Sequence, residues 1–247
     1  MSPETSSAPA LEVRGVSVTF GGVSALTQVS LNVRPGEVTG LIGPNGAGKT
    51  TLFNVISGLQ RPDNGEVLLG GRDVTKLGPH RRARLGLART FQRLELFGSL
   101  SARDNVQAGI DAKREKGDLT AQGLLHRVGI GGDADRQVST LPTGEARLVE
   151  LARALAIDPR LGLLDEPCSG LDDNESHLLG GLLRELAGEG RAVLIVEHDM
   201  PLVLAVCDRI IVLDFGQVIA DGTPEEIRRD PRVQAAYLGT AFEEEGS

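Results

Sequence analysis

The stretch of sequence that decides the fold is Gly43-Pro44-Asn45-Gly46-Ala47-Gly48-Lys49-Thr50, or GPNGAGKT. It matches the pattern G-x-x-x-x-G-K-[ST] at every fixed position. An apolar segment that we expect to be a strand, Glu37–Ile42, leads into it, and Lys49–Ser57 has the apolar spacing of a helix that ends at Gly58. Small residues allow backbone N–H groups to surround phosphate oxygens, and the start of a helix adds partial positive charge. The stretch therefore predicts a phosphate-binding loop.

Three side chains of this loop carry the expected chemistry. Lys49 is expected to reach the β- and γ-phosphates of a nucleotide, Thr50 to offer its hydroxyl to Mg²⁺, and Thr51 to hydrogen-bond a phosphate. The alternative is a glycine-rich turn with an incidental lysine. The complete match, placed between a strand and a helix, favours the phosphate loop.

A second motif supplies the acidic half of a nucleotide site. The apolar segment Leu161–Leu164 runs directly into Asp165 and Glu166. We expect Asp165 to hold Mg²⁺, directly or through water, and Glu166 to face the γ-phosphate and to orient or deprotonate water. Acidic residues often end strands as solvated turns, but the phosphate loop in the same chain favours the functional interpretation.

Composition narrows the class of protein. The 247 residues include 26 Lys+Arg and 34 Asp+Glu, which gives a net charge of −8, and only 6 Phe, 1 Tyr and no Trp. A basic footprint for nucleic acid and aromatic platforms for bases are therefore not expected. The apolar run Met200–Cys207 is far shorter than the about twenty residues of a bilayer-spanning helix. Cys168 and Cys207 are too few for a disulfide framework and are expected to be reduced thiols.

Along the chain, we expect a disordered tail at residues 1–10, one domain at residues 11–240 and an acidic tail at residues 241–247. Within the domain, strands alternate with helices, which is typical of a parallel sheet. The stretch Pro79–Gly132 is interpreted as several helices, with Asp118–Val128 the clearest. The predicted strands are Leu11–Phe20, Ala25–Val33, Leu161–Leu164, Ala192–Val196 and Arg209–Leu213, and the other predicted helices are Glu145–Ile157, Asn174–Gly188 and one that begins at the capping box Thr223-Pro224-Glu225-Glu226. This order predicts an α/β core with a helical insertion.

Five further features follow in a fixed order around the phosphate loop and the two carboxylates. They are Phe20 at the end of the first strand, Gln92 in Thr90-Phe91-Gln92, the loop Leu141-Pro142-Thr143-Gly144-Glu145 at the head of a helix, the turn Ser169-Gly170-Leu171-Asp172, and His198 after the strand Val193–Val196. Each feature alone is weak, since an aromatic, a polar loop residue or a histidine commonly has no such role. Their order and spacing over about residues 11–240 resemble the ATP-binding subunits of ABC transporters.

The resemblance implies an α/β phosphate-loop NTPase core, an antiparallel β-subdomain and an α-helical subdomain inserted at about residues 86–158. It implies ATP as the nucleotide, with Phe20 stacked on adenine, and Mg²⁺ held by Thr50, Asp165 and Gln92. Glu166 then activates water, His198 reaches the γ-phosphate, and Gln92 couples the site to the helical subdomain.

Partners are also implied by the resemblance. Two ATPase subunits, identical or related, close head to tail, so that the signature loop Leu141–Glu145 faces the ATP of the partner and the D-loop Ser169–Asp172 lies beside it. The subunit is expected at the cytoplasmic face of the cell membrane as a peripheral protein. It works there with transmembrane permease subunits and, indirectly, with an extracytoplasmic solute-binding protein.

The signature loop departs from the family pattern Leu-Ser-Gly-Gly-Gln. Only Leu141 and Gly144 match, because Pro142, Thr143 and Glu145 occupy the other positions. Pro142 lacks both the serine hydroxyl and a backbone N–H donor, and Glu145 places an acid near the helix start. We therefore hypothesise that the ATP site completed by this loop is weakened, with Thr143 as a substitute hydroxyl.

Other segments resemble one subfamily, the ATPases of branched-chain amino acid importers. These segments are Gly86–Gln92 with Leu96-Phe97, Glu197–Met200, Asp221–Pro224 and Ala236–Gly239. The same subfamily shades into ATPases of urea, other amide and lipid transport. An ATPase subunit does not touch the transported solute, so the solute, the direction of transport and the dimer partner stay open.

Two functions from other classes are the alternatives. A phosphate-loop metabolite kinase would not require the signature loop, the D-loop and His198 in this order, and would transfer phosphate rather than hydrolyse ATP. A nontransport ABC ATPase acting on nucleic acid or ribosomes usually carries two cassettes or a long coiled-coil insertion. One cassette, a short insertion and the net acidity disfavour it.

Overall fold

The central feature of the fold is a six-stranded sheet, seen in a computed structural model that describes residues 8–91, 93–113 and 118–237. The strand order is β10-β9-β3-β8-β7-β6. The strands are β3 (Val38–Ile42), β6 (Leu87–Arg89), β7 (Leu161–Asp165), β8 (Ala192–Val196), β9 (Arg209–Asp214) and β10 (Gln217–Gly222). All pairs are parallel except β10 with β9. The predicted parallel α/β sheet is therefore confirmed.

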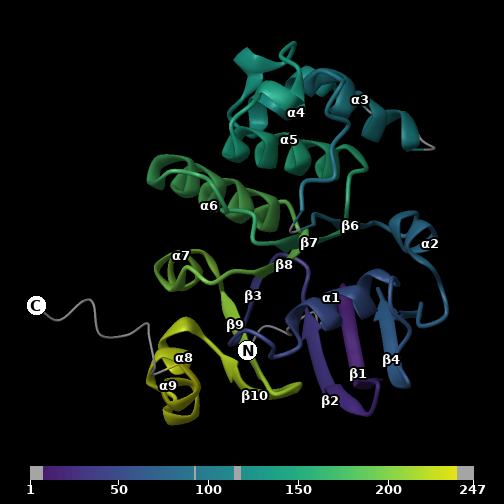
Figure 1. The fold of residues 1–247 in the computed structure, drawn as a ribbon, viewed down its shortest axis with the longest axis vertical. Coiled ribbons are helices and arrows are strands. Elements are labelled where there is room, and N and C mark those ends of the chain that lie inside the picture. The colour runs from purple at the N-terminus through teal and green to yellow at the C-terminus, as the bar shows by residue number, and fades with distance from the viewer. Residues whose placement is uncertain (1–7, 92, 114–117, 238–247) are drawn as a thin grey trace, which may run out of the picture.

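A second, antiparallel sheet has the order β2-β1-β4-β5. Its strands are β1 (Leu11–Phe20), β2 (Val23–Val33), β4 (Asn64–Leu69) and β5 (Arg72–Asp73). Helix α1 (Lys49–Ser57) lies beside this sheet in Figure 1, and its buried Leu52, Phe53 and Ile56 share a hydrophobic cluster with residues of both sheets. The helix that follows the phosphate loop is thus held between the two sheets.

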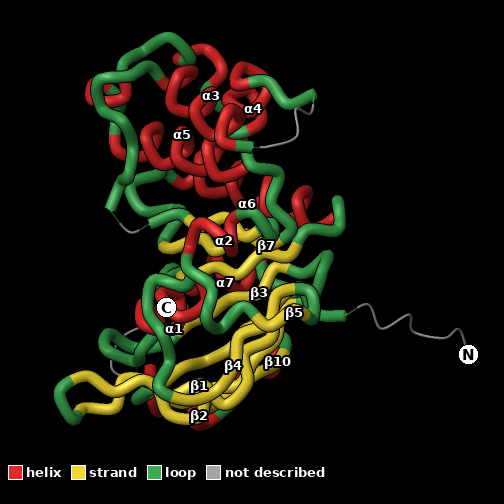
Figure 2. The backbone as a smooth tube through the Cα atoms, turned by 90° about the vertical axis from the view of Figure 1, so that its right-hand side faces the viewer, coloured by secondary structure: helices red, strands yellow, loops and turns green. Residues whose placement is uncertain are grey.

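The helices form two groups, one packed on the central sheet and one at the end of the molecule away from the antiparallel sheet (Figure 1). The distal part contains α3 (Ala102–Ala112), α4 (Ala121–Arg127) and α5 (Thr143–Ala156), which pack against one another at the top of Figure 1 and in Figure 2. Buried residues of α5, α6 (Asp173–Gly188) and α7 (Met200–Val206) share one hydrophobic cluster with the central sheet. The remaining helices are α2 (Pro79–Ala83), α8 (Pro224–Arg229), α9 (Pro231–Tyr237) and the short 3₁₀ turns Gly131–Asp133 and Val138–Thr140.

Several elements begin and end where the sequence predicts. The first helix spans Lys49–Ser57 and ends at Gly58, and Thr223 and Glu226 form both bonds of the capping box. Thr120 caps α4, so the helix expected over Asp118–Val128 is shorter. None of the helices in the described part of the chain is both long and apolar enough to cross a membrane.

The interpretation of Pro79–Gly132 as helices is wrong near its start. Leu87–Arg89 forms β6, which pairs in parallel with β7 in the central sheet. Three residues are too few to show a strand period, so only the long-range pairing with β7 reveals this strand. Helix α3 begins at Ala102, well after β6. The expected subdomain range, residues 86–158, stays a prediction, although its first strand pairs with the core.

Candidate nucleotide-binding site

The phosphate loop connects the carboxyl end of β3 to the start of α1, as the sequence predicts. Gly43 is required there by close packing, since a Cβ atom would lie 2.0 Å from the carbonyl oxygen of Leu213. The Lys49 Nζ donates hydrogen bonds to the carbonyl oxygens of Gly43 and Pro44, the second at 3.0 Å. The ammonium group therefore lies across the loop, at the place where phosphates would be bound.

Lys49 shares its surroundings with the two predicted carboxylates. Burial lowers the pKa of Lys49, whereas Glu166 and then Asp165 act in the opposite direction through their negative charges. These residues come from the carboxyl ends of strands β3 and β7, which both pair with β8. The structure thus brings the two halves of the predicted site together.

Asp165 is a buried carboxylate with a fixed backbone. Its N–H donates to the Thr90 Oγ1 at 3.1 Å, and its Oδ2 lies 3.7 Å from the Arg89 Nη2. Burial raises the pKa of Asp165, while the Arg89 guanidinium is the largest opposing influence. The side chain is therefore oriented by β6 as well as by its own strand.

Arg89 is a residue of this site that the sequence analysis missed. Its Nη1 donates to the Asn54 Oδ1 at 2.8 Å and to the Ser57 Oγ at 2.7 Å, and its guanidinium lies 4.8 Å from the centre of the Phe91 ring. One side chain thus connects α1, β6 and Asp165. A charged residue directly after the apolar pair Leu87 and Ala88 was the signal that could have revealed it.

Glu166 and His198 follow adjacent strands, β7 and β8. Glu166 has a positive φ of 47°, a region that non-glycine residues rarely occupy, and its N–H donates to the Val196 carbonyl at 2.9 Å. His198 is exposed. Between them lies Glu197, a buried carboxylate that the sequence analysis also left without a role.

The signature loop and the D-loop contact each other within the chain. A Cβ atom on Gly144 would lie 2.6 Å from the carbonyl oxygen of Gly170, so this contact requires glycine at the matching signature position. Asp172 caps α6 in a capping box with Glu175. Pro142 is the N-cap of α5, and Thr143 is the first residue of that helix.

Glu145 lies in the first turn of α5, as the sequence predicts, and it has a partner. Its Oε2 is 3.3 Å from the Arg136 Nη1, and Arg136 also binds Asp133 at 2.8 Å and donates to the Thr140 carbonyl at 3.2 Å. The carboxylate is therefore partly neutralised by a cation of its own chain.

Phe20 ends β1 and leaves 51% of its surface exposed, which an aromatic platform for a base requires. Thr50 is exposed and Thr51 half-buried at the start of α1. Cys168 and Cys207 are both free thiols, as expected. Gln92 lies outside the described residues.

With this geometry in place, the family can be assigned. The family model described as ABC transporter matches residues 26–169, and the model described as branched-chain amino acid ATP-binding cassette transporter matches residues 217–243. The chain belongs to the ABC transporter family. It is accordingly an ATP-binding cassette with ATPase activity.

The cassette has relatives of similar length. It is 39% identical over 255 residues to the high-affinity branched-chain amino acid transport ATP-binding protein BraF of Pseudomonas aeruginosa, covering 95% of this chain and 100% of the relative. Its identity to LivG of Escherichia coli, a protein of the same description, is 37% with the same coverage. The lipopolysaccharide export system ATP-binding protein LptB of Acidithiobacillus ferridurans is 42% identical over 219 residues, covering 87% of this chain and 90% of that protein.

Solved structures agree with the assignment. The ADP conformation of an ATP-binding cassette of an ABC transporter superposes with a TM-score of 0.83 at 30% identity, over 94% of this chain and 99% of that one. A dimeric cassette in a post-hydrolysis state, bound to ADP and Pi, gives a TM-score of 0.78 at 28% identity, over 87% and 98% of the two chains.

The donor set of the cassette fits a magnesium ion that is bound together with a nucleotide. The described residues contain no group of three His, Cys, Asp or Glu side chains that could hold a metal alone. The exposed Thr50 hydroxyl and the Asp165 carboxylate are oxygen donors, which Mg²⁺ prefers, and Mg²⁺ usually takes its other ligands from phosphates and water.

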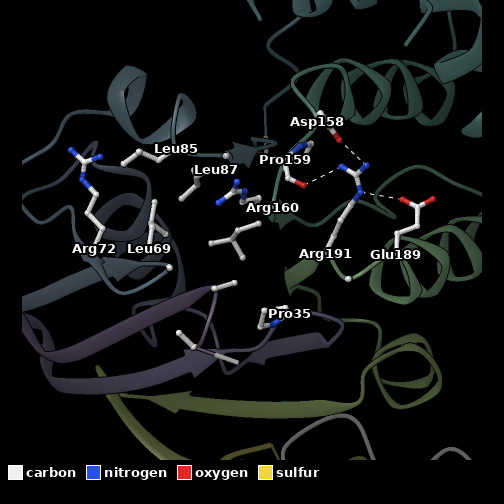
Figure 3. Close-up of a pocket in the computed structure, with 16 residues that line it drawn as sticks. Pro35, Leu69, Arg72, Leu85, Leu87, Asp158, Pro159, Arg160, Glu189 and Arg191 are labelled. Atoms are coloured by element: carbon white, nitrogen blue, oxygen red, sulfur yellow. Dashed lines mark hydrogen bonds and ion pairs between the residues drawn. The ribbon is translucent and has the colours of Figure 1, made fainter. Parts of the chain in front are cut away.

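A hollow of about 700 Å³ lies elsewhere on the cassette (Figure 3). It is at the amino ends of β7 and β8, where Arg160 and Arg191 precede the strands, whereas the phosphate loop follows the carboxyl end of the parallel β3. Arg191 binds Asp158 at 2.8 Å and Glu189 at 3.1 Å in this hollow. The nucleotide site and the hollow therefore lie at opposite ends of the parallel strands of the central sheet.

Proposed function

We propose that this cassette hydrolyses Mg·ATP to energise the import of branched-chain amino acids through membrane permease subunits. The convergence of Lys49, Asp165 and Glu166 supports the hydrolysis. The similarity to BraF and LivG from end to end supports the class of solute.

In this proposal, each side chain has one task. Residues 43–51 surround the triphosphate, and Lys49 neutralises charge on its β- and γ-phosphates. Thr50 and Asp165 hold Mg²⁺, which stabilises negative charge on the phosphates during transfer. Phe20 stacks on adenine. Gln92, in the family position between core and helical part, contributes to the metal site.

The reaction itself rests on positioning and electrostatics. Glu166 is proposed to orient the attacking water and accept its proton, and His198 to contact the γ-phosphate and hold this arrangement. Lys49 and the backbone N–H groups of the loop then stabilise the charge that develops on the leaving phosphate oxygens.

The assembly is proposed to be a head-to-tail dimer at the cytoplasmic face of the membrane. The similarity to a dimeric cassette and to subunits of transport systems supports a dimer that works with permease subunits. In it, Leu141–Glu145 faces the partner's ATP and Ser169–Asp172 lies beside it. A related second ATPase is the preferred partner, because it would supply a complete signature loop to this chain's own phosphate loop. An extracytoplasmic solute-binding protein completes the system.

Transport by the assembled complex is the decisive test. The cassette is co-expressed with its permease subunits, reconstituted in proteoliposomes, and assayed for ATP-dependent uptake of labelled leucine, isoleucine and valine, with Lys49→Ala as the inactive control. Uptake of these amino acids that depends on Lys49 supports the proposal. Hydrolysis without any such uptake contradicts the solute class.

The similarity to LptB supports lipid export as the second candidate. It predicts copurification with permease subunits that extract lipopolysaccharide, and no stimulation of ATPase activity by amino acids. ATPase activity stimulated by nucleic acid, or phosphate transfer to a metabolite, would instead favour the nontransport alternatives.

A further inference from the structure

Glu197 is a fully buried carboxylate between two loops of the nucleotide site. It directly follows β8, and only 2% of its surface is exposed. An ionised carboxylate is costly to bury unless hydrogen bonds compensate for the lost water. The hydrogen-bond partners of Glu197 therefore indicate why a carboxylate is buried at this position.

Each oxygen of Glu197 faces one backbone N–H group. Oε1 accepts from the Cys168 N–H at 2.9 Å, and Oε2 accepts from the His198 N–H at 3.3 Å. The His198 Nδ1 is 3.9 Å from the same Oε2. Burial raises the pKa of Glu197, while the Cys168 N–H, the charge of His198 and the His198 N–H act in the opposite direction and Glu166 adds to the rise.

The N–H group of Cys168 belongs to the loop that carries Glu166. That loop begins with Glu166 at a positive φ of 47° and is also tied to β8 by the bond from the Glu166 N–H to the Val196 carbonyl. Glu197 supplies the second tie, two residues further along. Together the two bonds fix the direction in which the Glu166 side chain leaves the backbone.

We propose that Glu197 is a positioning residue, which locks the loop of Glu166 to the loop of His198 through one carboxylate. This proposal rests on the catalytic roles proposed for those two residues. Displacement of reacting groups by about 1 Å can cost on the order of a hundredfold in rate. A tie between the two loops therefore bears directly on turnover.

A carboxylate is required because its partners are donors: the two N–H groups and the Cys168 thiol, which also forms a side-chain hydrogen bond with Glu197. Glutamine has nearly the same shape, but its amide nitrogen would face one of the two N–H groups, and that bond would be lost. Aspartate is too short to span the same two groups with unchanged geometry. Glu197→Gln is therefore the most informative variant.

The experiment compares Glu197→Gln with Glu225→Gln, which removes the same charge from an exposed position in the first turn of α8. For Glu197→Gln we expect kcat to fall by about tenfold or more, with the KM for ATP and the affinity for ADP within about twofold of wild type. Hydrogen exchange should become faster in the segment 166–169. Glu225→Gln should leave kcat, the KM for ATP, the affinity for ADP and the hydrogen exchange of this segment unchanged.

A double-mutant cycle with Glu166→Gln tests whether Glu197 acts by positioning Glu166. If it does, Glu197→Gln costs much less in the Glu166→Gln background than in wild type. Additive losses, or a Glu197→Gln variant with wild-type kcat, overturn the positioning role. Glu197→Gln that lowers ATP affinity and kcat equally indicates general loss of structure and also overturns it.

The two proposals fail in different ways. A wild-type cassette that does not hydrolyse Mg·ATP when assembled with its ATPase and permease partners contradicts the proposed function and, with it, the positioning role. Active wild-type protein with an unaffected Glu197→Gln variant contradicts the positioning role alone.

Discussion

The phosphate loop and the signature loop both consist of a turn followed by the start of a helix, but they differ in the residues that they contact. At the phosphate loop, burial lowers the pKa of Lys49, and the charges of Glu166 and Asp165 of the same chain act on Lys49 against that effect. The signature loop instead contacts the D-loop through Gly144 and is bound by Arg136 through Glu145.

This difference bears on which substitutions in the two loops disturb the packing of the chain itself. A side chain at Gly43 of the phosphate loop would disturb packing against β9, as the approach of Gly43 to Leu213 shows. In the signature loop, the position in contact with the D-loop, Gly144, matches the family pattern. Of the positions that differ, Pro142 and Thr143 are exposed and Glu145 is half-buried at the start of α5. Thr143 also lies close to Gly170 of the D-loop.

The largest effect is expected for the phosphate loop. Lys49→Ala removes the cation on the β- and γ-phosphates, so that both ATP affinity and turnover should collapse. Isothermal titration with ATP and a phosphate-release assay measure the two quantities. Lys76→Ala, at an exposed position, is the matched control. A Lys49→Ala variant that binds and hydrolyses Mg·ATP like wild type would show that the phosphate loop is assigned wrongly.

The next effect concerns Glu166, the carboxylate that we propose to face the same phosphates. Glu166→Gln keeps the shape and loses the charge, so hydrolysis should fall by about a hundredfold or more while nucleotide binding survives. ATP should then trap a closed dimer, detectable by size-exclusion chromatography with light scattering. Glu66→Gln, an exposed position in β4, should form no such dimer. Undiminished steady-state hydrolysis would assign the catalytic role to another residue.

A substitution of Arg89 tests whether α1, β6 and Asp165 depend on one another through this side chain. Both Arg89 and Asp165 have side chains that are 7% exposed, and removal of one partner of a buried pair typically costs about 3–5 kcal/mol. Arg89→Ala should therefore lower the free energy of unfolding by an amount of this order, and it should weaken Mg²⁺-dependent ATP binding. Urea denaturation and titration with ATP at varied Mg²⁺ measure both effects. Arg93→Ala, at an exposed position, is the control. Unchanged stability and Mg²⁺ dependence would separate Arg89 from the site.

Features that depend on adjacent residues could be predicted from the sequence, and features that depend on distant residues could not. Local signals were sufficient for α1 and for the capping box at Thr223, because each is written in a few adjacent residues. Strand β6 could not be found in this way, since Leu87–Arg89 becomes a strand only through its pairing with β7. Arg89 and Glu197 were missed for a related reason. Their partners are distant in sequence, and only the fold brings them together.

The signature loop carries the smallest expected effect. Pro142→Ser with Glu145→Gln restores a hydroxyl and a backbone N–H donor and removes one negative charge from each loop. If the weakened-site hypothesis holds, the double variant should show higher ATPase activity as an isolated protein, or a tighter ATP-driven dimer. Arg136 already neutralises part of the Glu145 charge, so the gain should come mainly from the restored donors.

The two substitutions are expected to have separate effects on the signature loop. Pro142→Ser alone should give most of the gain, because it supplies both donors. Glu145→Gln alone should give little, and it should also weaken one ion pair of Arg136. Asp133→Asn is the control, since it removes the charge of another partner of Arg136 without changing the signature loop. ATPase activity and dimer formation are measured for each single variant and for the double variant.

A gain from Glu145→Gln alone would mean that Arg136 does not neutralise the acid. Unchanged or reduced activity in all variants would mean that Thr143 and the local backbone already compensate, and the hypothesis of a weakened site would be wrong.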